Sequence, residues 1–134
     1  MAAALLLGAC VPEEGPLMDP GSDCMRCHGS GGGEDEARPW TVAGTVYPTA
    51  TSAAGDGVLG ARVHVRDASG FAFTLRTNLA GNFYSAESVA LPLEVCVEHG
   101  GAEKCMPIPA PQGSCNACHR QPPRNGAPGR LHVP

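Results

Sequence analysis

Cysteine spacing constrains this chain more than any other feature. Its 134 residues include seven cysteines, and four of them form two Cys-x-x-Cys pairs, each followed directly by a histidine. The first pentapeptide, CMRCH, spans residues 24–28, and the second, CNACH, spans residues 115–119. Aromatic residues make up only 4% of the chain, while Gly (18) and Pro (13) are abundant. A small chain of this kind buries a modest apolar area, so we expect cross-links or cofactors to support its fold.

A Cys-x-x-Cys-His pentapeptide is the signature of covalent haem attachment. Its two thiols can form thioethers with the vinyl groups of one porphyrin, and the adjacent histidine can then bind the iron as the proximal ligand. The sequence therefore predicts two covalently attached haem c groups. The predicted haem-binding residues are Cys24, Cys27 and His28 for the first group, and Cys115, Cys118 and His119 for the second.

Other roles for the paired cysteines are less consistent with the pattern. Two Cys-x-x-Cys pairs can form a tetrahedral zinc site, but zinc ribbons hold their pairs about 15–20 residues apart. Here a whole β-rich segment separates them, and zinc gives no reason for a histidine after each pair. A thioredoxin-like redox pair needs a βαβ context, and no helical period lies near either motif. Two simple disulfides remain a further alternative.

The sixth ligand of each iron is less constrained by sequence. A second histidine lowers the reduction potential of a haem, whereas a methionine raises it. His64 lies in a strand-like run where alternation puts it on the face opposite Val63 and Val65. His132 follows the second motif in a loop-like tail, and Met106 precedes that motif. Our predicted distal ligands are His64 and His132, with Met106 as the alternative; Met18 and Met25 are the other plausible methionines, and His99 is expected to be a bystander.

The N-terminal residues 1–9, MAAALLLGA, form a short apolar run that ends at Cys10. Spanning a bilayer takes about 20 apolar residues, so this run is more typical of an export signal. The string LLGAC, residues 6–10, resembles the bacterial lipobox. That resemblance implies a signal peptide over residues 1–9 and acylation of Cys10, which would anchor the chain to a membrane. The alternative is an apolar tail with a free cysteine.

The middle of the chain has an all-β pattern. Short runs rich in Val, Thr, Phe and Tyr alternate with Gly, Asn and Asp turn signals. Strands are predicted over residues 41–47, 61–66, 71–77, 81–85, 93–98 and 103–108. The predicted core consists of Val42, Val46, Val63, Val65, Phe73, Leu75, Phe83, Val95 and Val97.

The segment over residues 40–108 resembles the carboxypeptidase regulatory-like domain, an immunoglobulin-like or transthyretin-like β-sandwich. The matching stretches are VAGTV at 42–46, LGARVHVRD at 59–67, SG at 69–70 and TNLAGNFY at 77–84. The resemblance implies a structural or adhesive domain without catalysis. We therefore expect a mainly β fold, with this sandwich flanked by irregular segments. Residues 10–39 would form the tether and first haem-binding segment, and residues 109–134 the second haem-binding segment.

Cys96 and Cys105 lie on the two arms of a predicted hairpin. A disulfide between them is the natural interpretation in an exported protein, because such compartments are oxidising. The count of cysteines agrees with this pairing. One acylated cysteine at Cys10, four haem thioethers and one disulfide account for all seven.

Charge and composition narrow the classes of function. The net charge is −4 and the chain has no basic stripe, which argues against a nucleic-acid partner. We expect an electron carrier that is not an enzyme. Its lipid would anchor it outside the cytoplasm, and we expect the membrane to be the outer membrane. The protein would face either the periplasm or the cell surface. Its partners would be other redox proteins, and assembly with further cytochromes is compatible with the sequence. The alternatives are a haem-based sensor, a dihaem peroxidase-like enzyme, and a non-haem zinc-binding adhesive β module.

Overall fold

The protein is a small, mainly β sandwich in a computed structural model that describes residues 15–31 and 38–134. Cys10 and the predicted signal peptide lie outside the described residues. The strands are β1 (Val42–Thr45), β2 (Arg62–Arg66), β3 (Ala72–Arg76), β4 (Asn82–Ser85), β5 (Glu94–His99) and β6 (Ala102–Cys105). One helical turn, α1 (Met25–His28), precedes them, and a 3₁₀ turn, η1 (Cys115–Ala117), follows them. In the described part of the chain, no helix is both long and apolar enough for a membrane crossing.

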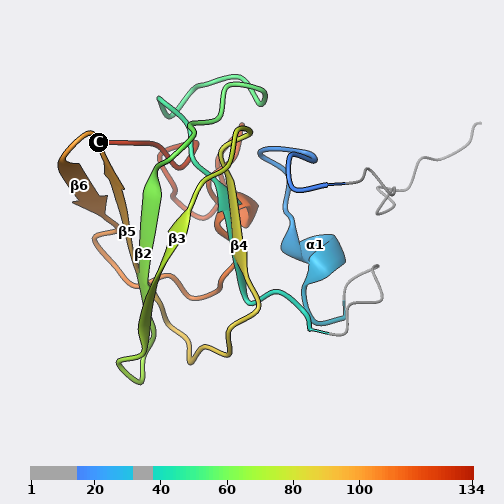
Figure 1. Ribbon diagram of the computed structural model, residues 1–134, viewed down its shortest axis with the longest axis vertical. Coiled ribbons are helices and arrows are strands. Elements are labelled where there is room, and N and C mark those ends of the chain that lie inside the picture. The colour runs from blue at the N-terminus through green and yellow to red at the C-terminus, as the bar shows by residue number, and fades with distance from the viewer. Residues whose placement is uncertain (1–14, 32–37) are drawn as a thin grey trace, which may run out of the picture.

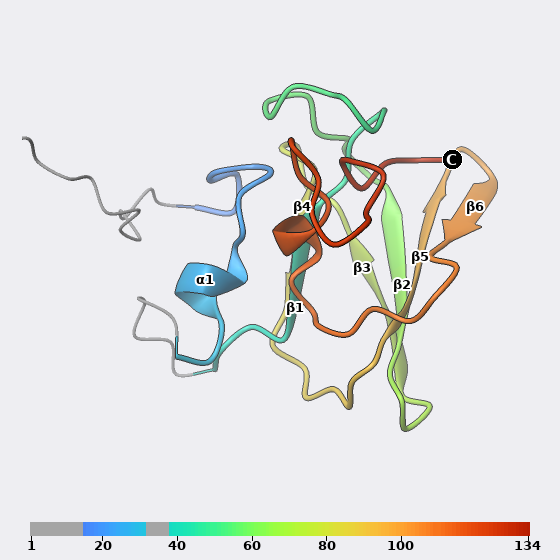
Figure 2. The same cartoon turned by 180° about the vertical axis from the view of Figure 1, so that it is seen from behind.

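Two antiparallel sheets form the sandwich. β1 pairs with β4, and the larger sheet has the strand order β3-β2-β5-β6. Figures 1 and 2 show α1 beyond the β1–β4 pair, on the side away from the four-stranded sheet. The first motif therefore lies against the smaller sheet. The C-terminus, by contrast, returns to the end of the molecule where β5 and β6 meet (Figures 1 and 2).

All six predicted strands are present; five of them are shorter than predicted, and β5 has the predicted length but lies one residue further along the chain. β2 shows the expected alternation, because Val63 and Val65 are buried while Arg62 and Arg66 on the other face are exposed. The largest difference is at β6, which ends at Cys105 although the sequence pattern predicted a strand to residue 108. Pro107 has no backbone N–H, so it cannot continue the hydrogen-bonded ladder.

The core lies between the two sheets and is built largely from small aliphatic side chains. Seven of the nine predicted core residues are buried, and Phe73 and Leu75 on β3 pack against them half-buried. Sequence reasoning missed Tyr47 and Leu93, which are both completely buried. Tyr47 lies two residues after β1 and directly follows the buried Val46, and Leu93 directly precedes β5 on the buried face of that strand.

The C-terminal segment is part of the sandwich rather than an appendage. The Ala43 amide donates to the carbonyl of Gly113 (2.9 Å), and the Tyr47 amide donates to that of Leu131 (2.8 Å). Ala110 and Leu131 lie in the hydrophobic core. A Cβ atom on Gly113 would stand 1.7 Å from the carbonyl oxygen of Thr41, so only glycine permits this close approach. Ala110 and Leu131 therefore belong to the same hydrophobic core as the strands.

Asp67 organises the turn between β2 and β3. Its Oδ1 accepts hydrogen bonds from the Ser69 amide (2.9 Å) and the Phe71 amide (2.9 Å), and its Oδ2 accepts one from the Ala90 amide (2.8 Å). The hydroxyl of Ser69 also donates to Oδ1 (2.6 Å). These donors, with the Ser69 hydroxyl contributing most, lower the pKa of Asp67 below its usual value of 3.8.

Replacing Asp67 by Asn should lower the melting temperature at neutral pH, because an amide cannot accept all four bonds. A carboxylate with a lowered pKa stabilises the fold above its usual pKa and loses this contribution as pH falls through the lowered value. The difference in melting temperature between the native chain and Asp67→Asn should therefore become smaller in acid. Circular dichroism melts between about pH 6 and pH 3 measure this gap. A gap that stays constant across the range would contradict the role assigned to the carboxylate.

Candidate functional site

The first Cys-x-x-Cys-His motif forms a single helical turn. The amide of His28 donates to the carbonyl of Cys24 (3.0 Å), which closes α1 and places both cysteines and the histidine along one short segment. The His28 ring stacks on Trp40 with centroids 4.1 Å apart, and Trp40 stacks on Tyr84 with centroids 4.2 Å apart. This stack of three rings fixes the orientation of His28 against β4.

A cavity of about 360 Å³ lies beside this motif. It is within the range of about 300–1,000 Å³ that is typical of cofactor pockets. Its lining is mostly apolar, and it includes the motif residues Cys24, Cys27 and His28 together with Met18, Trp40, Phe83 and Tyr84. The segment that carries Met18 is held in place by Asn82, whose side-chain amide donates to the Met18 carbonyl (2.9 Å). We call this space cavity 1.

The second motif forms η1 and continues to His119. The His119 amide donates to the carbonyl of Cys115 (2.9 Å), and the imidazole Nδ1 lies 3.0 Å from the carbonyl oxygen of Gly129. A carbonyl can only accept, so Nδ1 carries the proton and Nε2 keeps its lone pair. Burial lowers the pKa of His119, and the neighbouring His132 lowers it further, which favours this neutral form.

A second cavity of about 350 Å³ lies beside this motif, and we call it cavity 2. Cys118 and His119 line it, and so do both distal-ligand candidates of the C-terminal half, His132 and Met106. The Nδ1 atom of His132 lies 2.8 Å from the carbonyl oxygen of Val133, which again leaves Nε2 as the lone-pair nitrogen. Val95 and Val97 form part of the apolar wall, and Lys104 and Arg130 provide its cationic groups.

The two motifs adjoin, although they lie at opposite ends of the sequence. Asn116, the first spacer residue of the second motif, is 1% exposed. Its Nδ2 donates to the Ser22 carbonyl (2.9 Å) and to the Thr45 hydroxyl (3.0 Å), and its Oδ1 accepts from the Thr45 amide (3.1 Å). In addition, the hydroxyl of Ser114 donates to Asp23. Both motifs are thereby fastened to each other and to the end of β1.

The sulfurs of Cys24 and Cys115 are not poised for thiolate chemistry. Burial raises the pKa of Cys24 to about 11 and that of Cys115 to about 12, whereas reactive Cys-x-x-Cys pairs have lowered values. Cys115 packs against the core instead of lining cavity 2. Cys27 is disulfide-bonded in this structure, so a thioether at this sulfur requires its thiol form.

The structure places His64 away from both motifs. It lies on the outer face of β2, where Nδ1 is 2.7 Å from the Thr74 hydroxyl and Nε2 is 2.6 Å from Oε2 of Glu98. His64 lines neither cavity. The geometry therefore gives its prediction as a distal ligand no support. His99, the expected bystander, ends β5 and is exposed.

The predicted disulfide between Cys96 and Cys105 is present, with an S–S distance of 2.03 Å. The two residues are direct partners across β5 and β6. Gly100 and Gly101, both with positive φ, turn the chain between these strands. The disulfide closes the hairpin on the outer face of the four-stranded sheet.

Comparisons with protein-family models, curated proteins and solved structures found no match to this chain. Its functional interpretation therefore depends on its own residues. Sequence reasoning identified both motifs but missed Asn116, Trp40 and Gly129 as residues that position them. The only signal in the sequence was the position of Asn116 inside a motif. The haem-attachment signature does not require any particular residue at a spacer position, so it could not indicate the structural role of this asparagine.

Replacing Asn116 by Ala should destabilise the protein by about 1–3 kcal/mol, because buried polar partners on β1 and near Ser22 lose their hydrogen bonds. Denaturant unfolding measures this change. Gln112→Ala, at an exposed position close by, is the matched control and should change stability little. Equal stability of the two variants would show that the buried amide does not hold the motifs together.

Proposed function

We propose that this chain is a dihaem c-type cytochrome that transfers electrons outside the cytoplasm. The observation that carries this proposal is that each Cys-x-x-Cys-His motif lines its own apolar cavity, which also contains a second side chain suited to bind iron. Haem would supply a one-electron iron couple. The residues of the chain would attach, orient and shield it.

The ligands of cavity 2 favour a bis-histidine site. His119 and His132 both have Nδ1 committed to a backbone carbonyl and Nε2 available. A hydrogen bond at Nδ1 is the usual way in which a protein fixes the tautomer and orientation of a metal-binding histidine. Met106 lines the same cavity and remains the alternative to His132. Arg130 and Lys104 are suited to pair with the carboxylates of a porphyrin.

The residues of cavity 1 favour a different ligand pair. His28 is the motif histidine. Outside the motif, Met18 is the residue that lines this cavity and carries a soft ligand atom, its thioether sulfur. A methionine ligand raises the potential of a haem relative to a second histidine. The two sites would therefore differ in potential, with the higher value at cavity 1. Among the described residues that line this cavity, Asp19 and Asp23 carry carboxylates and none is a lysine or an arginine, so porphyrin carboxylates would face solvent there.

The contact between the motifs supports electron transfer between the two sites. The Asn116 side chain reaches Ser22, two residues before the first motif, and its Nδ2 lies 4.0 Å from the Cys24 sulfur. Two cofactors attached to adjoining segments would lie close together. An encounter with a redox partner would be transient, as small interfaces of that class are. Anchoring through Cys10 and an exported location remain part of the proposal.

The zinc alternative lacks a gathered set of thiols. Among the described residues, the groups of three or more metal-ligating side chains whose ligand atoms lie within 4.8 Å of one another include no motif cysteine. A tetrahedral Cys₄ site needs its sulfurs about 2.3 Å from one ion. The sensor and peroxidase alternatives would need an iron with an open coordination position, which the oxidised spectrum of the native protein would reveal.

Removing one motif should remove one haem. Chains with Cys24→Ala and Cys27→Ala, or with Cys115→Ala and Cys118→Ala, should each hold half the haem of the native protein after maturation in a host that attaches haem c. Haem absorbance per chain under denaturing conditions gives this ratio. The control is Cys96→Ala with Cys105→Ala, which should keep both haems. Full haem content in either motif variant would contradict the assignment.

The ligand assignment predicts distinct effects on the two potentials. Met18→Ala should lower the higher potential, and His132→Ala should raise the lower one, because each loses the ligand that sets it. Each variant should also gain a five-coordinate, high-spin signal in its oxidised spectrum. A potentiometric titration followed by absorbance separates the two steps. Met106→Ala is the control for cavity 2, and a change there with none in His132→Ala would reverse the assignment. High-spin iron in the native protein would instead favour a sensor or an enzyme.

A further inference from the structure

Three side chains with metal-ligating atoms converge on the outer face of the four-stranded sheet. His64 comes from β2, Glu98 from β5 and Glu103 from β6, which are neighbouring strands. The Nε2 atom of His64 lies 2.6 Å from Oε2 of Glu98 and 3.9 Å from Oε2 of Glu103. One ligand atom from each residue lies within 4.8 Å of the other two. None of the three lines cavity 1 or cavity 2.

The strand register brings two like charges together here. Glu98 and Glu103 are direct partners across β5 and β6. Like charges at directly opposed positions destabilise an antiparallel pair. Arg62 lies 3.6 Å from Oε1 of Glu98, so it addresses only one oxygen of one carboxylate. The two Oε2 atoms remain beside His64, and a bound cation would relieve their repulsion.

The hydrogen bond on the far side of His64 prepares its ring for a metal. Nδ1 lies 2.7 Å from the hydroxyl of Thr74 on β3. When Nδ1–H donates to this hydroxyl, Nε2 carries the lone pair and points toward the two carboxylates. Such outer partners of a ligating histidine fix its tautomer and orientation, and their loss typically costs 10–100-fold in metal affinity.

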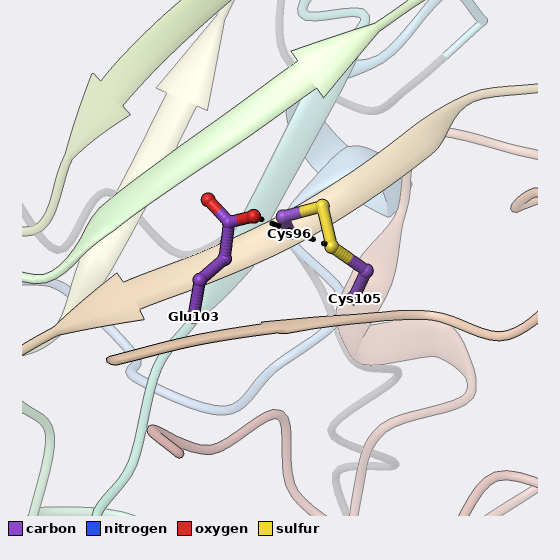
Figure 3. A group of neighbouring side chains, drawn as sticks. All are labelled: Cys96, Glu103 and Cys105. Atoms are coloured by element: carbon purple, nitrogen blue, oxygen red, sulfur yellow. Dashed lines mark hydrogen bonds between the residues drawn. A yellow bond between two sulfur atoms is a disulfide. The ribbon is translucent and has the colours of Figure 1, made fainter. Parts of the chain in front are cut away.

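The neighbouring disulfide makes the site rigid but does not contribute ligands. Figure 3 shows the Glu103 carboxylate beside the bond between Cys96 and Cys105, and Oε1 of Glu103 lies 3.7 Å from the Cys105 sulfur. Both sulfurs are used in the disulfide, so neither is a thiolate. The disulfide instead fixes the register that sets Glu98 opposite Glu103. Sites on braced strands hold their geometry better than sites on loops.

We infer that His64, Glu98 and Glu103 form a binding site for a divalent transition metal ion of the Zn²⁺ type, separate from the two cavities. One imidazole nitrogen and two carboxylate oxygens are a donor set that Zn²⁺ accepts, and three protein ligands leave a fourth position for water. The side chains of His64, Glu98 and Glu103 are 34%, 32% and 52% exposed, so the ion and its water have access from solvent. The metal ion would take the place of any proton that Nε2 of His64 shares with Glu98.

Zinc titration by calorimetry tests this inference on the full-length, haem-loaded protein. Free thiols are alkylated beforehand, so binding at any unattached motif cysteine is removed, and failure of the cytochrome proposal would not affect the result. We expect a binding step that His64→Gln and Glu103→Gln each weaken by more than about tenfold, since even outer partners have effects of that size. Glu94→Gln is the matched control, because Glu94 is a glutamate on β5, the strand that carries Glu98, and it lies 3.8 Å from Arg66 instead.

The outcomes separate a metal site from an ion pair. Loss of the step in both variants, with an unchanged step in Glu94→Gln, supports the site. Absence of zinc binding by the native protein, or equal binding by His64→Gln, would overturn it and leave only the contact between His64 and Glu98. Melting curves of each variant without zinc check folding. Glu103 is the more exposed residue, so its variant keeps the test valid if His64→Gln folds poorly.

Discussion

The buried amide of Asn116 is the contact on which the arrangement of the candidate site depends. It joins the second motif to Thr45 on β1 and to the Ser22 carbonyl just before the first motif. A buried polar group must find partners because leaving it unsatisfied costs about 1–3 kcal/mol. This requirement selects one mutual position for two segments that carry little regular structure. The sandwich therefore acts as a mount that holds both motifs at the end of β1.

The sequence predicted the sandwich better than the position of the segments around it. Alternation in runs such as residues 62–66 identifies a strand and its buried face, because side chains in a strand alternate between two environments. The hairpin disulfide followed from two cysteines on opposite arms of a turn. Residues 109–134 have no such periodicity. Single backbone hydrogen bonds, such as the one from the Tyr47 amide to the Leu131 carbonyl, hold this segment in place. No pattern of residue types predicts such bonds.

The histidines also show that the sequence predicts the strand face of a residue better than the neighbours of its side chain. Sequence placed His64 on the outer face of its strand, which is correct, but it could not reveal that Glu98 and Thr74 occupy the space around the ring. Conversely, His132, the other predicted distal ligand, lies in a loop, and the structure brings it into the same cavity as His119. Long-range packing decides which histidines share a site. Two cavities therefore lie beside the motifs, and the cluster of His64, Glu98 and Glu103 lies apart from them on the outer face of the four-stranded sheet.

The proposed electron transfer requires that the two Cys-x-x-Cys-His motifs carry haem. The most direct measurement is the intact mass of the native chain under denaturing conditions, after export in a host with the machinery for haem c attachment. We expect a mass increase of two haems that survives denaturation, because thioethers are covalent. A chain that matures and folds in that host but shows no added haem mass would contradict it, and the motifs would then need another explanation.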